Sequence, residues 1–255
     1  ERLLGLVGSE MCIRDRFEAA AHHMGDAYLN YSFTKGSEQE VAFLIKELDL
    51  KPGMRLLDVG CGPGRHSHLF ARAGITVLGI DISQKFVDIA STAEVSGANF
   101  LRLDARNLQF DKEFDAVISL CQGAFGLAGE TNRPVPMADP DGEILKRMSQ
   151  ALVVGGKVAL SAFSAYFQVH FLEENKDTFF ADHGVNHEKT TIRNASGEEI
   201  TQDLWTSCFT PRELRLLAKD ANLSVQSIWS VTPGKYKKTP PTYTQAEFLM
   251  IAMRE

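Results

Sequence analysis

Short apolar runs alternate with amphipathic stretches through most of this 255-residue chain. A run such as Ile75–Ile80 is rich in β-branched residues and has the length of a buried strand. Between the runs, apolar residues recur at helical spacing, as Leu69, Phe70 and Ala73 do. This alternation predicts right-handed crossovers and a mostly parallel sheet. The strands that we expect span residues 55–59, 75–80, 98–103, 114–120, 157–163, 223–231 and 247–253.

Helices are expected between these strands, and their ends carry recognisable signals. The helix of residues 141–151 should end in a turn at Val154–Gly156. Another helix should begin after Thr210, because Pro211 and Glu213 follow it in a capping-box pattern. The remaining helices of this part are expected at residues 66–73 and 84–92.

Residues 164–208 depart from this alternation of strands and helices. This stretch is polar and contains histidines, and its two β-prone runs flank a short loop at residues 195–197, which predicts a β-hairpin. It has too few apolar residues for a core of its own. We therefore expect an insertion after strand five that acts as a lid, within a single domain of residues 17–255.

The N-terminal part divides in two. Residues 1–16 include V-G-S-E-M-C-I-R-D-R, which resembles translated sequencing-adapter sequence, so we expect a non-native or disordered arm there. Residues 17–50 should form a helical cap, with a short helix at 17–24. A second helix should begin at Ser37, because Glu40 stands three residues later as in a capping box.

Composition narrows the possible partners. The chain is 44% hydrophobic and 24% charged, as a globular domain is, and its formal net charge is −6. An acidic chain is a poor match for nucleic acid as main partner. Its four cysteines have no zinc-type spacing, and no apolar run is long enough for a membrane span. We expect no metal and a cytoplasmic location.

The most informative stretch follows the first strand. Gly60, Gly62 and Gly64 alternate there, so the backbone can approach a ligand closely. A dinucleotide-binding turn would need glycine at the position of Arg65, which disfavours a nicotinamide oxidoreductase, and the Gly-Lys-Ser/Thr of a P-loop is absent. An acid, Asp58, precedes the turn by two residues, and further acids follow strands two and three.

This ordered set resembles the nucleoside-binding core of the class I S-adenosylmethionine (SAM)-dependent methyltransferases. The resemblance implies a Rossmann-like, doubly wound α/β fold, with a seven-stranded mostly parallel sheet and a C-terminal antiparallel hairpin. It also implies SAM as cofactor and S-adenosylhomocysteine as product. The cofactor-binding residues that it suggests are Asp58, Gly60, Cys61, Gly62, Asp81, Ile82, Asp104, Ala105, Leu120 and Cys121.

Three of these residues have an alternative role. Asp81 would accept the ribose hydroxyls, or it would cap the helix that follows. Asp104 would accept the adenine amino group, or it too would cap. Asp58 would contact the cofactor ammonium, or it would bind the amides of the turn.

The residues that would bind the acceptor are harder to identify from the sequence. Candidate catalytic residues are Tyr31, His66 and Gln122, although His66 equally fits a cap at its helix. None of them is identified as a general base. Candidate acceptor-binding residues, for which packing or solvation is the alternative, are Tyr28, Tyr166, His170, His187, Arg193 and Trp205.

The expected activity is in-line transfer of the sulfonium methyl to an N, O, S or C atom of a small molecule, with positioning and water exclusion as the main tasks. Alternatives are a non-catalytic SAM-binding regulator, or a methyltransferase that acts on protein or tRNA. Leu120–Gly123 lacks the N-P-P-Y type sequence of amino-methylating nucleic-acid and glutamine enzymes. Acceptor and oligomeric state stay open.

Overall fold

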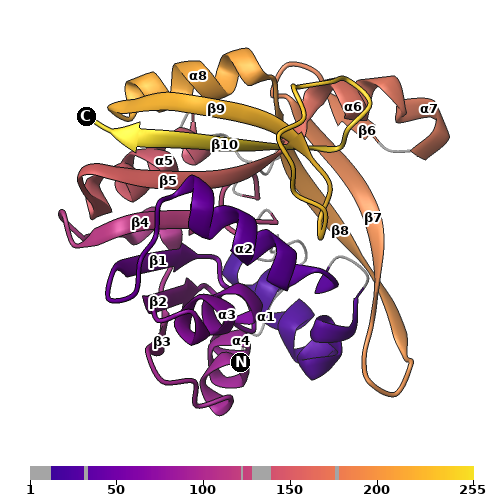
Figure 1. Cartoon of the computed structure of the whole chain (residues 1–255). Coiled ribbons are helices and arrows are strands. Elements are labelled where there is room, and N and C mark those ends of the chain that lie inside the picture. Colours follow the sequence, from indigo (N-terminus) through magenta and orange to yellow (C-terminus); the bar gives the residue numbers. More distant parts are fainter. Residues whose placement is uncertain (1–12, 32–33, 122, 128–138, 176–177) are drawn as a thin grey trace, which may run out of the picture.

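The computed structural model describes residues 13–31, 34–121, 123–127, 139–175 and 178–255. Five neighbouring parallel strands run from one edge of the sheet to its middle (Figure 1). They are β1 (Arg55–Val59), β2 (Thr76–Asp81), β3 (Ala98–Arg102), β4 (Phe114–Ser119) and β5 (Leu152–Ser164). Beside β5 lies β10 (Glu247–Arg254), antiparallel to β5 and to β9 (Leu223–Val231). The order β3-β2-β1-β4-β5-β10-β9 confirms the predicted doubly wound sheet with its antiparallel hairpin.

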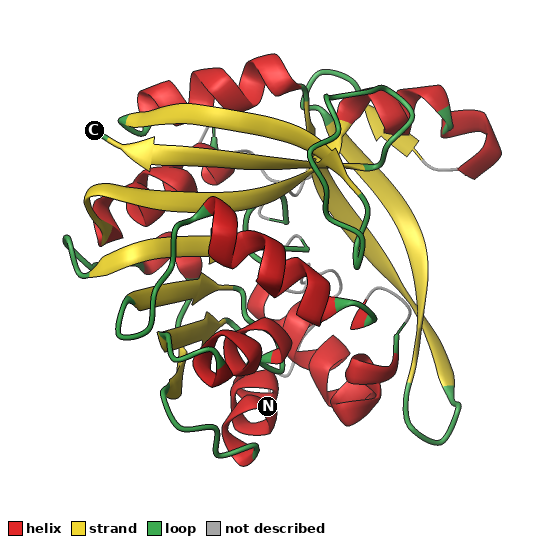
Figure 2. Cartoon of the chain, viewed as in Figure 1, coloured by secondary structure: helices red, strands yellow, loops and turns green. Residues whose placement is uncertain are grey.

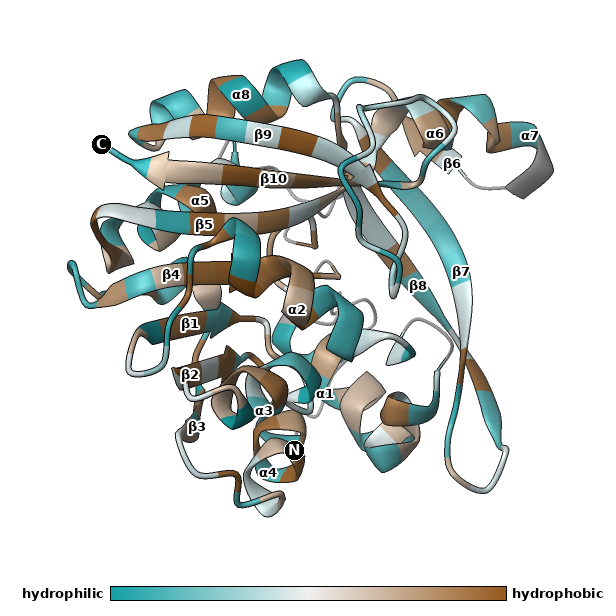
Figure 3. Cartoon of the chain, in the orientation of Figure 1, coloured by the Kyte–Doolittle hydropathy of each residue, from teal (hydrophilic) through white to brown (hydrophobic). Residues whose placement is uncertain are grey.

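Helices cover both faces of this sheet (Figure 2). Neighbouring residues of a strand point to opposite faces, so Leu56 belongs to one apolar cluster and Leu57 to the other. The Leu56 cluster includes residues of α2 (Ser37–Glu47) and α3 (Arg65–Arg72). The Leu57 cluster includes residues of α5 (Pro140–Ala151) and α8 (Pro211–Asp220). Figure 3 shows the resulting hydrophobic stripes on the central strands.

Strand β5 differs from its prediction. It begins at Leu152 rather than Lys157, so the glycines expected in a helix-ending turn lie within the strand. The pairing with β4 shifts register there, and Gly155 has a φ of 79°. A glycine tolerates this left-handed conformation, which lets the strand absorb the irregularity without ending.

The insertion contains α6 (Ala165–His170), α7 (Leu172–Asn175), β6 (Thr178–Phe180), β7 (Val185–Arg193) and β8 (Glu199–Phe209). The predicted hairpin is the antiparallel pair β7–β8, which we call the arm. Strand β8 also pairs in parallel with the end of β5, through Phe163↔Cys208 and Ser164↔Phe209. The arm is therefore anchored at the carboxyl edge of the main sheet.

The N-terminal part differs from expectation in two places. Helix α1 spans Ile13–Met24, so residues 13–16 belong to a helix, and Arg16 is buried. This corrects the expected boundary of the N-terminal arm; residues 1–12 lie outside the described chain. The turn η1 (Gly25–Asn30) follows, and α4 (Gln84–Thr92) lies beside α1. We call residues 13–31 the cap segment.

The capping box predicted at Ser37 is wrong. The N-cap of α2 is Gly36, with a φ of 92° and no side-chain cap bond. The Glu40 carboxylate is instead fully buried, 3.0 Å from Arg65 Nη1 and 2.6 Å from His66 Nε2, and accepts from Gly234 N at 2.6 Å. Burial acts to raise the pKa of Glu40, but the His66 hydrogen bond and the charges of His66 and Arg65 outweigh it and hold the pKa below its ordinary value. Tertiary ion pairing has overridden the local capping pattern.

We predict that Glu40→Gln lowers the free energy of unfolding by about 3–5 kcal/mol, because it leaves the buried Arg65 charge without its partner. Urea unfolding of both proteins measures this. The control is Glu38→Gln, on the exposed face of the same helix, which should change stability by less than about 0.5 kcal/mol. Equal unfolding midpoints for the two variants would contradict the prediction.

Candidate active site

The glycine turn after β1 is held on the tip of β2. Gly60 N and Cys61 N both donate to Ile80 O, at 2.8 and 2.9 Å, and Gly64 N donates to Cys61 O at 3.0 Å. Gly62 has a φ of 53° and Gly60 of 77°, which L side chains rarely adopt. The alternating glycines thus let the backbone turn back over strand β2.

Gly60 has a second reason to be glycine. A Cβ built there would lie 2.2 Å from the carbonyl carbon of Gly123, in the loop after β4. At Gly62 the same construction meets only the Tyr28 ring, at 3.9 Å from its hydroxyl oxygen. Gly60 therefore permits close packing of the β1 and β4 loops, whereas Gly62 leaves the turn open toward the cap segment.

Asp81 joins the turn to the next helix. Its Oδ2 accepts from Gly62 N at 2.9 Å and its Oδ1 from Ser83 N at 2.9 Å. The N-cap of α4 is Ser83, whose hydroxyl accepts from Phe86 N, so the alternative reading of Asp81 as that cap is wrong. Burial raises the pKa of Asp81 to about 6. A carboxylate offers about four acceptor sites, so two stay available to ligand hydroxyls.

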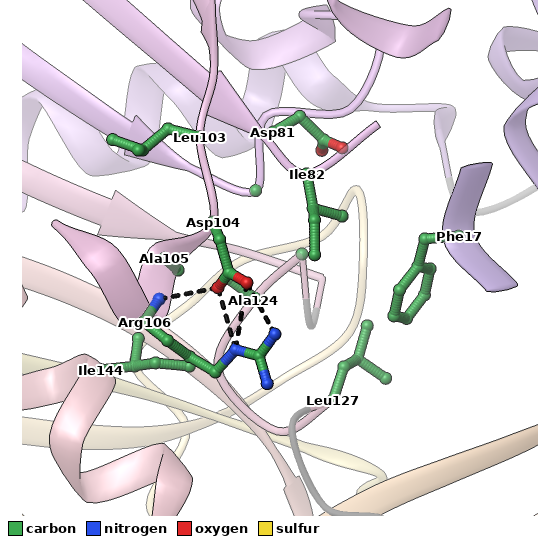
Figure 4. Close-up of a pocket in the computed structure, with 12 residues that line it drawn as sticks. Phe17, Asp81, Ile82, Leu103, Asp104, Ala105, Arg106, Ala124, Leu127 and Ile144 are labelled. Carbon is green, nitrogen blue, oxygen red and sulfur yellow. Dashed lines mark hydrogen bonds and ion pairs between the residues drawn. The ribbon is translucent and has the colours of Figure 1, made fainter. Parts of the chain in front are cut away.

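A cavity of about 420 Å³, open solvent at its mouth included, lies at the carboxyl edge of the sheet (Figure 4). Asp81 and Asp104 contribute carboxylates to a mostly apolar wall, and Phe17 closes it from helix α1. The described lining residues are Phe17, Gly60, Asp81, Ile82, Leu103, Asp104, Ala105, Arg106, Gly123, Ala124, Leu127 and Ile144. An apolar slot with two acids at its edge fits an adenosine group.

Asp104 performs the capping role that was its alternative. It accepts from Arg106 N at 2.9 Å at the start of the short turn η3 (Ala105–Asn107), and the Arg106 guanidinium binds its carboxylate at 2.6 Å. Burial acts to raise the pKa of Asp104, but these Arg106 bonds outweigh it and lower the pKa. The carboxylate still lines the cavity, so capping and ligand contact are compatible here.

Other predicted cofactor residues make contacts within the protein. Asp58 accepts from the Ser67 hydroxyl at 2.6 Å, and burial raises the pKa of its carboxyl group. This bond ties α3 to β1 and involves none of the turn amides. Cys121 N donates to Ser161 Oγ, and its sulfur accepts from Arg65 at 2.8 Å. Leu120 is buried in the α2–α3 cluster. None of the three is among the described residues that line this cavity.

Two predicted catalytic residues are placed elsewhere. The His66 ring is buried against Glu40 and does not reach the cavity. Tyr31 reaches the arm: its hydroxyl donates to Arg193 O at 3.1 Å and accepts from Arg193 N at 2.6 Å. The third, Gln122, lies outside the described residues. In this structure the recorded contacts of His66 and Tyr31 are with Glu40 and Arg193, and their catalytic roles stay predictions.

The cap segment covers the turn. The Tyr28 ring stands over Gly62 and packs edge-on against Phe86 at 5.1 Å, and burial raises the pKa of its hydroxyl. Glu18 of α1 accepts from Gln84 N at 2.8 Å and Lys85 N at 3.2 Å, at the exposed amides that begin α4. These contacts dock the cap segment on the glycine turn and on the start of α4.

The acceptor-side candidates fall into two groups. Tyr166 is 48% exposed on α6, and His170 packs on the edge of Tyr243. Neither is among the described residues that line the cavity. On the arm, His187 stacks on Trp205, with ring centroids 4.6 Å apart. Its Nε2 lies 2.8 Å from Oδ1 of Asp203. Sequence reasoning missed Asp203, although strand alternation places it on the same face as Trp205.

Within the described residues, no cluster of three or more His, Cys, Asp or Glu side chains has a metal-binding arrangement. Cys61, Cys121 and Cys208 are free thiols. None of the described helices combines the length and hydropathy needed to cross a bilayer.

Comparison with known proteins agrees with this geometry. Residues 56–156 match the family model "Methyltransferase domain". The chain is 25% identical to the cypemycin N-terminal methyltransferase of a Streptomyces species, over 80% of this chain and 84% of that protein. Its fold matches the CcbJ methyltransferase of Streptomyces caelestis, with TM-score 0.73, 14% identity, and 92% and 97% coverage. It also matches the magnesium protoporphyrin IX methyltransferase of Synechocystis PCC 6803 with bound S-adenosylhomocysteine, with TM-score 0.57, 18% identity, and 86% and 82% coverage.

We predict that affinity for SAM falls as the pH drops through about 6, by up to about tenfold per pH unit. Asp81 has a pKa of about 6, and as the expected ribose ligand it would have to be ionised to accept from both hydroxyls. Asp81→Asn should abolish this pH dependence and weaken binding at pH 8 by on the order of 10- to 100-fold. Calorimetric titration across pH 5–8 measures both effects.

The control for this titration is Asp111→Asn, which changes an exposed carboxylate away from the cavity. It should bind SAM as the unmodified protein does at each pH. A persisting pH dependence in Asp81→Asn would assign the proton to another group.

Proposed function

This chain is a class I SAM-dependent methyltransferase, and we propose that its methyl acceptor is a small molecule enclosed between the cap segment and the arm. The observation that carries the proposal is the contact between those two elements. Tyr31 binds the backbone of Arg193 twice, and His23 Nε2 lies 3.1 Å from Glu198 O. The cap segment thus contacts the loop end of the arm, and the other end of the arm joins the carboxyl edge of the sheet, where ligands of such folds bind.

A cover of this kind suits a compact acceptor. It leaves less access for a folded protein or an RNA duplex, and the net charge of −6 gives no general attraction to nucleic acid. Phe17 and Tyr28 contribute apolar surface next to the cofactor cavity and the glycine turn, which would help to exclude water. These features favour the small-molecule reading over the macromolecular one.

Within this proposal, SAM supplies a methyl group activated by its sulfonium. Asp81 would hold the ribose, and Ile82 and Ala105 would flank the adenine in the slot that they line. Tyr28 would cover the amino-acid end of the cofactor above Gly62. The main contribution of these residues is orientation and water exclusion.

We propose nitrogen as the first candidate for the acceptor atom. Support comes from the relative named as the cypemycin N-terminal methyltransferase, which aligns along most of both chains. Oxygen and sulfur acceptors are the other outcomes of the test below.

We predict methyl transfer from radiolabelled SAM to at least one compact probe. The panel comprises benzylamine, a tetrapeptide with a free N-terminus, catechol and thiophenol, with bulk tRNA and denatured casein as macromolecular arms. Formation of S-adenosylhomocysteine is the measured quantity. Transfer only to tRNA or casein would overturn the small-molecule proposal, and SAM binding without transfer to any acceptor would favour a regulatory SAM-binding protein.

We predict that Tyr31→Phe accelerates SAM dissociation about tenfold. The substitution removes both hydrogen bonds to Arg193, worth about 1–2 kcal/mol together, and so loosens the cap segment over the cofactor. Stopped-flow displacement by excess unlabelled SAM gives the rate. Tyr243→Phe, at a tyrosine that is 59% exposed, is the control and should leave the rate unchanged. The same rate in Tyr31→Phe as in the control would show that the contact does not restrain the cap segment.

A further inference from the structure

We infer that His187 is the general base of the methyl transfer and that Asp203 positions it. The inference rests on the proposed function, because only an acceptor that carries a proton needs a base. The four observations that support it are the register of the arm, the hydrogen bond between the two side chains, their place relative to the cofactor, and their degree of burial.

The register of the arm brings the two side chains together. His187 pairs directly with Trp205, and Lys189 pairs with Asp203. Side chains two residues apart on a strand share a face, so Asp203 and Trp205 both lie beside the His187 ring. The ring is stacked on Trp205 with an interplanar angle of 16°, which fixes its plane.

The hydrogen bond sets the tautomer. Nε2 of His187 lies 2.8 Å from Oδ1 of Asp203, and an ionised carboxylate only accepts. The Nε2 atom must therefore carry the hydrogen, which leaves Nδ1 as the proton acceptor. This arrangement, a histidine oriented by a carboxylate, is that of an effective general base.

The arm places this pair near the cofactor. Strand β8 enters the main sheet at Cys208, which pairs with Phe163 at the carboxyl end of β5. Trp205 precedes Cys208 by three residues, or about 10 Å of extended chain. The Arg16 guanidinium lies 5.2 Å from the centroid of the Trp205 ring, and the next residue, Phe17, lines the cofactor cavity. One layer of side chains thus connects the cavity wall to the dyad.

The burial of His187 also suits a base. Its side chain is 24% exposed and that of Asp203 is 46% exposed, so the ring is held but reachable. Among the described residues, the charged groups on the His187 face of this part of the arm are Asp203 on β8 and Lys189 on the strand of His187, and Arg16 of α1 lies over the neighbouring Trp205 ring. Strand β6 pairs Thr178 with His187 and brings no charge.

In the proposed step, His187 takes a proton from the acceptor while the methyl group is transferred. A proton on the acceptor nitrogen or oxygen passes to Nδ1 of His187 as the acceptor lone pair forms a bond to the methyl carbon. The carbon–sulfur bond breaks, and its electron pair stays on sulfur, which yields S-adenosylhomocysteine. The Asp203 carboxylate stabilises the imidazolium, which then releases its proton to solvent.

The first test uses the fastest probe of the panel above. His187→Gln should lower kcat by about 10²- to 10⁴-fold, with SAM affinity within about twofold. In His187→Ala, added imidazole should restore part of the rate, which a merely structural histidine would not show. Asp203→Asn should lower kcat, and Asp203→Glu should recover part of it.

The matched control is His183→Gln. His183 belongs to the same insertion and also has an acidic neighbour, Asp182 at 3.7 Å, but its side chain is 55% exposed. Its substitution should leave kcat unchanged. Full activity of His187→Gln would overturn the assignment while leaving the proposed function intact.

A second test needs no acceptor. Nitrogen-15 spectra of the histidine rings should show His187 with hydrogen on Nε2 and a bare Nδ1, and Asp203→Asn should disturb that tautomer. The opposite tautomer in the unmodified protein would overturn the inference. If no probe is methylated, the proposed function fails on the panel and the base assignment fails with it, whatever tautomer the spectra show.

Discussion

The site depends on one buried carboxylate. Asp81 accepts hydrogen bonds from Gly62 in the turn after β1 and from Ser83 at the start of α4, so a single side chain ties together three elements. Burial raises its pKa to about 6, and the two backbone amides offset part of that cost. Because the bonds hold Asp81 at the tip of β2, the cavity has a rigid polar corner before any ligand arrives, and such preorganisation lowers the entropic cost of binding.

The other elements of the site are arranged around that corner. Glu18 docks helix α1 on the first amides of α4, and Tyr28 stands over the glycine turn. On the opposite side, the arm is anchored in the main sheet through Cys208 and meets the cap segment through Tyr31. The proposed cover is thus built from two segments far apart in sequence, the cap segment fixed to α4 and the arm fixed to the sheet. A cover of this construction can loosen at one contact without unfolding the core.

Features of the fold were predicted correctly from the sequence where the interactions that determine them act over a few residues. The strands, the hairpin and the cap of α8 were predicted because apolar periodicity, turn residues and capping boxes act over a few residues. The same capping rule failed at Ser37, where the buried charges of Arg65 and His66 draw Glu40 inward. The rule also could not choose between capping and ligand binding for Asp104. The structure combines the two, because the carboxylate that caps the turn also lines the cavity. Local patterns predict a residue's conformation better than they predict its partner.

By itself the sequence determined the class of fold and the cofactor core, because strand, glycine turn, helix and acid stand at fixed short spacings between Asp58 and Asp104. Only the tertiary structure decided what surrounds that core. Tyr31 and Arg193 meet across 162 residues, and Asp203 reaches His187 only because the arm has one particular register. Pairings of that kind depend on how the strands align and where the cap segment docks, and both are set by packing of the whole chain rather than by neighbouring residues.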